Sequence, residues 1–148
     1  MKLKSAIIGM GYISPSHIEA IRRTGFAEVK TCTDIDPGLA EKKATGWNIP
    51  LVTRTIDEVL EDPEIDVIHN CTPNYLHKEI NEKIIKANKH LFSEKPLARD
   101  SKESGELVKL LKENPHTVAA VNFNYRMNPL VQDLKDKMNA GEFGKPLL

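Results

Sequence analysis

A short glycine-containing segment follows the first apolar run of the chain and has the residue types needed to hold a phosphate group. Gly9 and Gly11 are separated by one residue, and Ser14 takes the third small position of a G-x-G-x-x-G/A pattern. Gly9 permits a tight turn, whereas Gly11 has no Cβ and lets a pyrophosphate approach the backbone. The N–H groups of Tyr12 and Ile13, at the start of the next helix, would then face the phosphates. A purely structural glycine turn explains the same six residues equally well.

An acidic residue at the end of the second apolar run gives the glycine segment a more specific meaning. Asp34 lies 25 residues after Gly9, where its carboxylate can accept hydrogen bonds from both hydroxyls of an adenosine ribose. The same carboxylate would repel a 2′-phosphate, so the sequence predicts NAD in preference to NADP. The alternative is that Asp34 or Asp36 only caps the helix that begins at Pro37, and Asp36 fits that role better.

A second polar turn, Thr72-Pro73-Asn74, directly follows another apolar run. If this run starts the second half of an open α/β sheet, its carboxyl end lies beside the glycine segment, and Thr72 and Asn74 face the same crevice. Thr72 or Asn74 could also serve as the N-cap of the following helix, and both roles can hold at once. His77 lies on the first turn of that helix, where a binding role competes with a surface or packing role.

Lys95 follows a further short run, within Glu94-Lys95-Pro96. A lysine at the end of a strand in a cleft can hold a substrate hydroxyl or take its proton, which the oxidation of an alcohol to a ketone requires. A lone lysine is more often only solvated. The position favours the chemical role, because this is the third successive strand end directed at one crevice.

These turns need a scaffold that brings them to one place. Strands are expected at 4–9, 28–33, 51–52, 66–71, 90–92 and 117–123, and helices at 17–23, 37–45, 55–60, 74–88, 101–112 and 129–138. Ser14 or Ser16 offers a hydroxyl cap to the first helix. The alternation predicts the α/β class, a doubly wound parallel sheet with helices on both faces. In the strand order 3-2-1-4-5-6, the polar turns meet at the carboxyl edge of the sheet.

Composition limits the classes of function. The chain has 148 residues, of which 40% are hydrophobic and 28% charged, so we expect one folded domain with a full core. Its 21 basic and 21 acidic side chains cancel, which gives no field to attract nucleic acid or anionic lipid. Cys32 and Cys71 lie in apolar runs, so no disulfide framework or metal site is expected, and a cytoplasmic location fits. The apolar N-terminal stretch is too short to span a membrane.

The ordered set of motifs resembles the glucose-fructose oxidoreductase / inositol dehydrogenase family, known as Gfo/Idh/MocA. The matching segments are GMGYIS, CTDIDP, CTPNYLH, KHLFSEKPLA and NFNYRMNP, and the likeness runs from about residue 3 to residue 147. Any one segment is unspecific, but their order is specific. The resemblance implies a Rossmann domain that binds NAD or NADP. It also implies hydride transfer between nicotinamide and a hydroxyl of a sugar, cyclitol or related polyol.

The resemblance further implies roles for individual residues. The cofactor-binding set comprises Gly9, Gly11, Tyr12, Ile13, Asp34, Thr72, Pro73, Asn74, His77 and Glu94. Within it, Glu94 lies near the nicotinamide ribose, while Lys95 lies at the substrate as the catalytic residue. Tyr125 and Arg126 match a tyrosine–arginine pair that the resemblance places at the substrate, although a packing tyrosine and a solvated arginine explain them as well. The Lys95–Pro96 bond is expected to be cis.

Members of this family continue into a second α/β domain, which carries the substrate pocket and the usual oligomer interface. We therefore interpret residues 1–124 as the dinucleotide-binding domain, and residues 125–148 as a linker helix and the start of a C-terminal domain that is missing here. This chain alone is expected to bind cofactor without turnover, and the full-length protein to form a homo-oligomer. Two alternatives remain, a non-catalytic dinucleotide-binding or regulatory module and an S-adenosylmethionine-dependent methyltransferase. In the methyltransferase, neither EKP nor TPN has a role.

Overall fold

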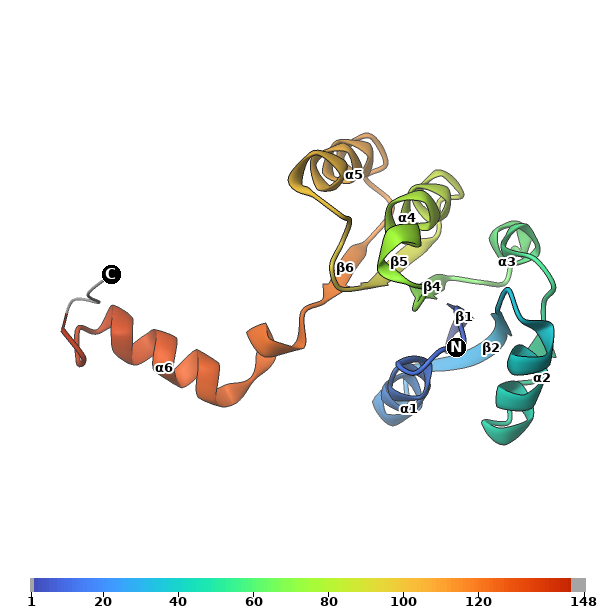
Figure 1. Ribbon diagram of the computed structural model, residues 1–148, viewed down its shortest axis with the longest axis horizontal. Helices are drawn as coiled ribbons and strands as arrows, with labels where there is room; N and C mark the ends of the chain where they lie inside the picture. The colour runs from blue at the N-terminus through green and yellow to red at the C-terminus, as the bar shows by residue number, and fades with distance from the viewer. Residues whose placement is uncertain (1, 145–148) are drawn as a thin grey trace.

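Six parallel strands form one sheet in the computed structural model, which describes residues 2–144 (Figure 1). The strands are β1 (Leu3–Ile8), β2 (Ala27–Thr33), β3 (Leu51–Val52), β4 (Val67–Asn70), β5 (His90–Glu94) and β6 (Ala119–Asn122). Their spatial order is β3-β2-β1-β4-β5-β6, and every neighbouring pair is parallel. The predicted α/β class and strand order are confirmed. The order of strands therefore reverses between β1 and β4, at the centre of the sheet.

The central strand β1 is covered by the core on both faces, which explains the apolar residues at successive positions near its end. Ala6 and Ile8 face one layer of the core and Ile7 faces the other, and none of them is more than 2% exposed. Alternate side chains of a strand point to opposite faces, so a stretch of strand covered on both sides is apolar at successive positions, as Ala6, Ile7 and Ile8 are. Each of these isoleucines contributes roughly 1.5–3 kcal/mol by leaving water.

Helices cover both faces of the sheet (Figure 1). The helices are α1 (Ser14–Thr24), α2 (Pro37–Gly46), α3 (Ile56–Glu61), α4 (His77–Lys86), α5 (Ser101–Glu113) and α6 (Pro129–Asn139), with 3-10 turns η1 (Asn74–Leu76) and η2 (Asn124–Met127). Helices α1 and α2 bury Ile18 and Ala40 against one face. Helices α3, α4 and α5 bury Val59, Ile84 and Leu107 against the other. No helix within residues 2–144 is long and apolar enough to cross a membrane.

The helix starts agree with the sequence at α2 and differ at α1. Asp36 caps α2, because its Oδ1 accepts a hydrogen bond from the N–H of Leu39 at 3.1 Å. The expected serine cap on α1 is wrong, because the N-cap residue is Ile13 and no side chain caps it. The Ser14 hydroxyl instead donates to the carbonyl of Gly11 at 3.0 Å, so it closes the glycine turn from within.

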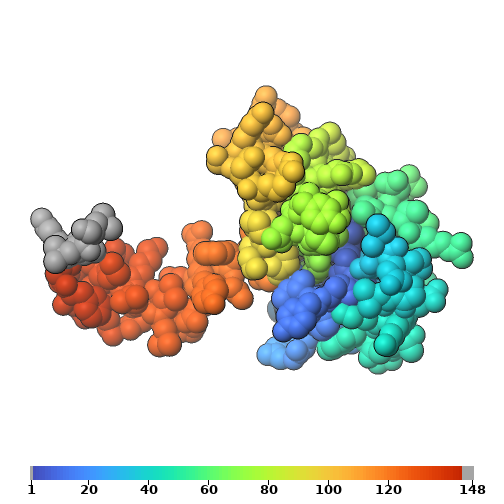
Figure 2. Space-filling model, in the orientation of Figure 1, coloured from blue at the N-terminus to red at the C-terminus, as the bar shows by residue number. Residues whose placement is uncertain are grey.

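The last described helix, α6, stands away from the sheet and its covering helices. It follows η2 and projects as an arm in Figures 1 and 2. Helix α6 contains no buried residue, and its Leu130 and Leu134 are largely exposed. Every buried residue of the described chain lies between Ser5 and Thr117, so the core is complete before the arm begins. The helix expected at 129–138 is confirmed. The division at residue 124 remains a prediction, and residues 145–148 lie outside the described part.

Candidate functional site

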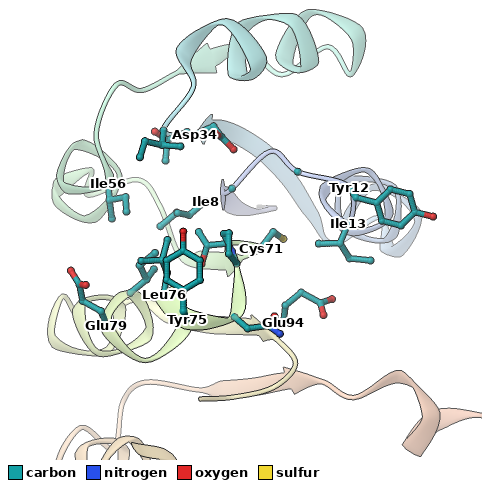
Figure 3. Close-up of a pocket in the computed structure, with 18 of the residues that line it drawn as sticks. Ile8, Tyr12, Ile13, Asp34, Ile56, Cys71, Tyr75, Leu76, Glu79 and Glu94 are labelled. Carbon is teal, nitrogen blue, oxygen red and sulfur yellow. The ribbon is translucent and has the colours of Figure 1, made fainter. Parts of the chain in front are cut away.

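A cleft of about 820 Å³ lies at the carboxyl edge of the sheet, where the strand order reverses (Figure 3). Asp34 and Ile56 lie towards one end of it and Glu94 towards the other, with Ile8 and Cys71 between them. Open α/β sheets bind ligands at this position, because the loops on either side of the reversal diverge to opposite faces and leave a crevice. The three polar turns identified from the sequence all line this cleft.

The two glycines of the first turn have different surroundings. Gly9 has a φ of +90°, and a Cβ built on it would lie 2.8 Å from the carbonyl atoms of Cys71 and from the nitrogen of Thr72. An L-residue is strained at this φ, and the neighbouring peptide leaves no room for a Cβ. Gly11 lines the cleft and has no atom within 4 Å of its Cβ position. Gly9 therefore lets two turns pack together, whereas Gly11 leaves room for a ligand.

The Asp34 carboxylate ties the end of β2 to the glycine turn. Its Oδ2 accepts a hydrogen bond from the N–H of Met10 at 2.6 Å, and its Oδ1 accepts one from the N–H of Asp36 at 3.0 Å. A carboxylate has about four lone-pair positions, so each oxygen can accept one more bond from the cleft. The alternative that Asp34 only caps α2 is wrong, since Asp36 caps that helix. Lys43 of α2 holds the turn from the other side, where its Nζ donates to the carbonyl of Gly11 at 2.5 Å.

The turn after β4 rests on a buried chain of polar side chains. Asn70 Oδ1 accepts hydrogen bonds from the N–H and the hydroxyl of Thr72, at 3.2 and 2.6 Å. Asn70 Nδ2 donates to Asn81 Oδ1 at 2.8 Å, and Asn81 Nδ2 donates to Ser93 Oγ at 3.0 Å. Asn70, Asn81 and Ser93 are fully buried, and a satisfied buried network fixes its members in place. The turns after β4 and β5 are therefore held in a fixed relation.

The helix expected from residue 74 begins as the 3-10 turn η1 and becomes α-helical only at His77. The expectation that Thr72 or Asn74 caps this helix is wrong. The Thr72 hydroxyl donates to Asn70, and no side chain caps η1. Thr72, Pro73 and Asn74 instead line the cleft. Their role in cofactor binding remains a prediction.

His77 does not line the cleft, contrary to what the resemblance implied. Its ring is fully buried, with Nδ1 2.5 Å from the carbonyl oxygen of Pro96 and Nε2 2.8 Å from that of Thr72. The spacing of His77, Ile80 and Ile84 on α4 places all three on the face that packs into the core. The packing role that the sequence left open is therefore the one that His77 has, and its ring links the turns after β4 and β5.

At the far end of the cleft, Glu94 and Lys95 have opposite environments. Glu94 is 6% exposed, and its Oε1 accepts hydrogen bonds from His17 Nε2 at 2.9 Å and from Asn122 Nδ2 at 2.6 Å. Lys95 is exposed and lines the cleft. The Lys95–Pro96 peptide bond is cis, as expected. Of these two neighbours, Lys95 is the one whose charged end is available to a ligand.

Of the remaining predicted site residues, two line the cleft and two do not. Tyr12 and Ile13 both line it, although the Tyr12 side chain is almost fully exposed and its ring is turned outward (Figure 3). Tyr125 and Arg126 lie in η2, on the segment that leads to the arm, and are outside the cleft wall formed by the described residues. Asn124, one residue earlier, is part of that wall. The substrate role of the tyrosine–arginine pair stays a prediction.

Sequence reasoning missed several residues of the site. Arg54, Ile56 and Asn122 also line the cleft, with Ile56 towards the end that holds Asp34 and Asn122 bonded to Glu94 at the opposite end (Figure 3). Asn122 could have been found, because it occupies the carboxyl end of β6 and the same strand-end rule identified the other turns. His17 gives no such signal, since its place on α1 is that of an ordinary buried helix residue.

Among α/β proteins with a glycine turn after the first strand, an acidic residue after the second strand and a cleft at the reversal are typical of dinucleotide-binding Rossmann domains. The family comparison agrees. The chain belongs to the Gfo/Idh/MocA family, described as "Oxidoreductase family, NAD-binding Rossmann fold", whose model matches residues 3–123. The family resemblance is confirmed, and the methyltransferase alternative is wrong.

Known relatives match the chain over most of its length. It is 31% identical over 148 residues to scyllo-inositol 2-dehydrogenase (NAD(+)) of Bacillus subtilis strain 168, covering 99% of this chain and 43% of the relative. It is 35% identical over 118 residues to levoglucosan dehydrogenase of Pseudarthrobacter phenanthrenivorans, covering 80% of this chain and 30% of the relative. The crystal structure of myo-inositol dehydrogenase from Lactobacillus casei with NAD(H) and myo-inositol superposes with a TM-score of 0.90 at 29% identity, covering 99% and 44%. The chain spans less than half the length of these relatives.

Proposed function

We propose that this chain is the NAD-binding part of a dehydrogenase that moves a hydride between nicotinamide and a hydroxyl-bearing carbon of a sugar, cyclitol or related polyol. The observation that carries the proposal is the single cleft lined by the glycine turn, Asp34 and the Glu94-Lys95 turn. Similarity to dehydrogenases named for inositol and levoglucosan supports the polyol class. The family description supports the nicotinamide cofactor.

The described residues fit the parts of NAD in order along the cleft. At one end, Asp34 keeps acceptor positions for the hydroxyls of the adenosine ribose. Next to it, the space beside Gly11 admits a pyrophosphate towards the N-terminus of α1, where backbone N–H groups and the helix dipole favour an anion. The nicotinamide riboside then extends to the end that holds Glu94 and Lys95. A volume of about 820 Å³ is within the range of ligand pockets.

Lys95 is the residue of this cleft best placed for proton transfer. When bound, the nicotinamide ring supplies the hydride acceptor. The exposed amine of Lys95 can hold the substrate hydroxyl and take its proton as the carbon that bears it is oxidised. The Glu94 carboxylate is already held by His17 and Asn122, so it is not the base.

Calorimetric titration of NADH into the 148-residue chain tests the binding step. We expect saturable binding by the unmodified chain and about tenfold or more weaker binding by Gly11→Ala, because the added methyl group occupies the space proposed for the pyrophosphate. The urea midpoint of Gly11→Ala should not fall, since the new methyl group meets no atom within 4 Å. Absence of NADH binding by the unmodified chain would refute the proposed function.

Asp34 should make the chain prefer NADH over NADPH by about tenfold, or about 1.4 kcal/mol. Its carboxylate lies at the proposed ribose position and would repel a 2′-phosphate while offering it no donor. Asp34→Asn removes the charge but keeps an acceptor oxygen, so it should bring the two dissociation constants closer together. Asp36→Asn, two residues away at the cap of α2, is the matched control and should leave the preference unchanged. Equal affinities in the unmodified chain would contradict this assignment.

A further inference from the structure

The Glu94 carboxylate accepts hydrogen bonds on both oxygens, and the two donors to Oε1 are far from it in the sequence. Oε1 accepts hydrogen bonds from His17 Nε2 at 2.9 Å and from Asn122 Nδ2 at 2.6 Å. Oε2 accepts one from the N–H of Lys95 at 3.1 Å. The three donors come from α1, from β6 and from the turn after β5, so Glu94 is fixed from three directions.

His17 is itself held in place behind Glu94. Its side chain is 2% exposed, and its Nδ1 lies 3.0 Å from Nδ1 of His69. An ionised carboxylate only accepts hydrogen bonds, so His17 carries a proton on Nε2. The two Nδ1 atoms lie within hydrogen-bond distance, so one of them carries a proton and the other accepts the hydrogen bond. Burial is the main cause that lowers the pKa of His69 to about 3, so His69 is neutral at neutral pH. Phe92 packs against both rings and completes the support.

We propose that His17 is a positioning residue which, together with Asn122, keeps Glu94 ionised at the nicotinamide end of the cleft, so that the cleft favours the oxidised cofactor. This inference rests on the proposed function, which places the adenosine at Asp34 and thus the nicotinamide near Glu94. The oxidised nicotinamide ring carries a positive charge that the reduced ring has lost. A fixed negative charge beside the ring therefore attracts NAD⁺ more than NADH.

The surroundings of Glu94 support its ionised state. Burial alone would raise its pKa, but the hydrogen bonds from His17, Asn122 and the N–H of Lys95 outweigh burial and hold the pKa below its ordinary value. Besides His17 and His69, the Cys71 thiol is an ionisable group of these buried surroundings, and its pKa is raised by burial and by the charge of Glu94. Because the pKa of Glu94 is lowered on folding, its charge is present at neutral pH and is lost only in acid.

The test compares the dissociation constants of NAD⁺ and NADH, measured by calorimetry at about pH 6 and about pH 8. Glu94→Gln should weaken NAD⁺ binding about fivefold to tenfold and change NADH binding less than about twofold. At about pH 6, the dissociation constants of His17→Ala should resemble those of Glu94→Gln, because the Glu94 carboxyl has lost a hydrogen-bond donor and takes a proton. At about pH 8, they should approach those of the unmodified chain. His17→Gln, whose amide can donate in place of Nε2, should restore the unmodified ratio. His116→Ala, which changes an exposed histidine, is the control.

Separate outcomes address the inference and the proposed function. If the unmodified chain binds neither form of the cofactor, the proposed function fails. If the chain binds both forms, and His17→Ala weakens both by the same factor at both pH values, His17 has only a structural role and the inference is overturned. Should His17→Ala fail to fold, the same dissociation constants are compared in Asn122→Ala, which removes the other donor to Oε1. Asn122 is less buried than His17, so its replacement disturbs the core less. An unchanged ratio in that variant overturns the inference equally.

Discussion

Replacing Gly9 with alanine is expected to lower the free energy of unfolding by about 2–5 kcal/mol. Two costs add at this position. A φ of +90° is unfavourable for an L-residue by roughly 1–2 kcal/mol. The new Cβ would also lie 2.8 Å from backbone atoms of Cys71 and Thr72, and overpacking of this kind costs about 1–3 kcal/mol. Urea denaturation followed by circular dichroism measures the difference.

Gly25→Ala is the matched control for this prediction. Gly25 also has a positive φ, of +73°, but its Cβ position meets no atom within 4 Å. Only the backbone cost applies there, so the loss should be about 1–2 kcal/mol. Equal losses for Gly9→Ala and Gly25→Ala would show that the contact with the turn after β4 does not constrain Gly9.

Lys95→Ala should lower kcat by about 100-fold or more, because proton transfer by a positioned side chain typically contributes roughly 10²- to 10⁴-fold. The assay follows nicotinamide absorbance during polyol oxidation, in a chain of the full length of the inositol dehydrogenase relatives. The affinity for NADH should change less than about twofold, since the proposed cofactor contacts come from other residues. That this 148-residue chain alone shows no turnover remains a prediction.

A surface lysine provides the comparison for Lys95. Lys102 is exposed on the first turn of α5, and Lys102→Ala should leave kcat unchanged. Lys95→Arg keeps a positive charge but cannot give up a proton near neutral pH, so it should be nearly as slow as Lys95→Ala. A Lys95→Ala variant with normal kcat would remove Lys95 from the mechanism.

The sequence predicts the parts of this site that depend on local chemistry at strand ends. The glycine turn, Asp34 and Lys95 each follow a short apolar run, and parallel strands bring such positions to one edge. The strand order then brings these turns together, because the order β3-β2-β1-β4-β5-β6 places them around a single reversal. The cleft could therefore be located before any side-chain geometry was known.

The sequence does not predict contacts between side chains that are far apart along the chain. His17 and Glu94 are 77 residues apart, and their pairing depends on how α1 lies against the far half of the sheet. His77 shows the opposite case, because the family motif places it at the cofactor while its helical spacing turns it into the core. His77 lies on the side of α4 that packs into the core. The motif alone does not contain this information and therefore predicts a cleft residue at this position.

The central place of β1 has a consequence for the nascent chain. Strand β1 is synthesised first, but it pairs with β2 on one edge and with β4 on the other. After β2 has emerged, the second edge of β1 stays unpaired until residues 67–70 follow. At roughly 5–20 residues per second this interval lasts on the order of seconds. During that time the central strand of the sheet presents open hydrogen-bonding groups, and an unpaired strand edge exposes the nascent chain to aggregation.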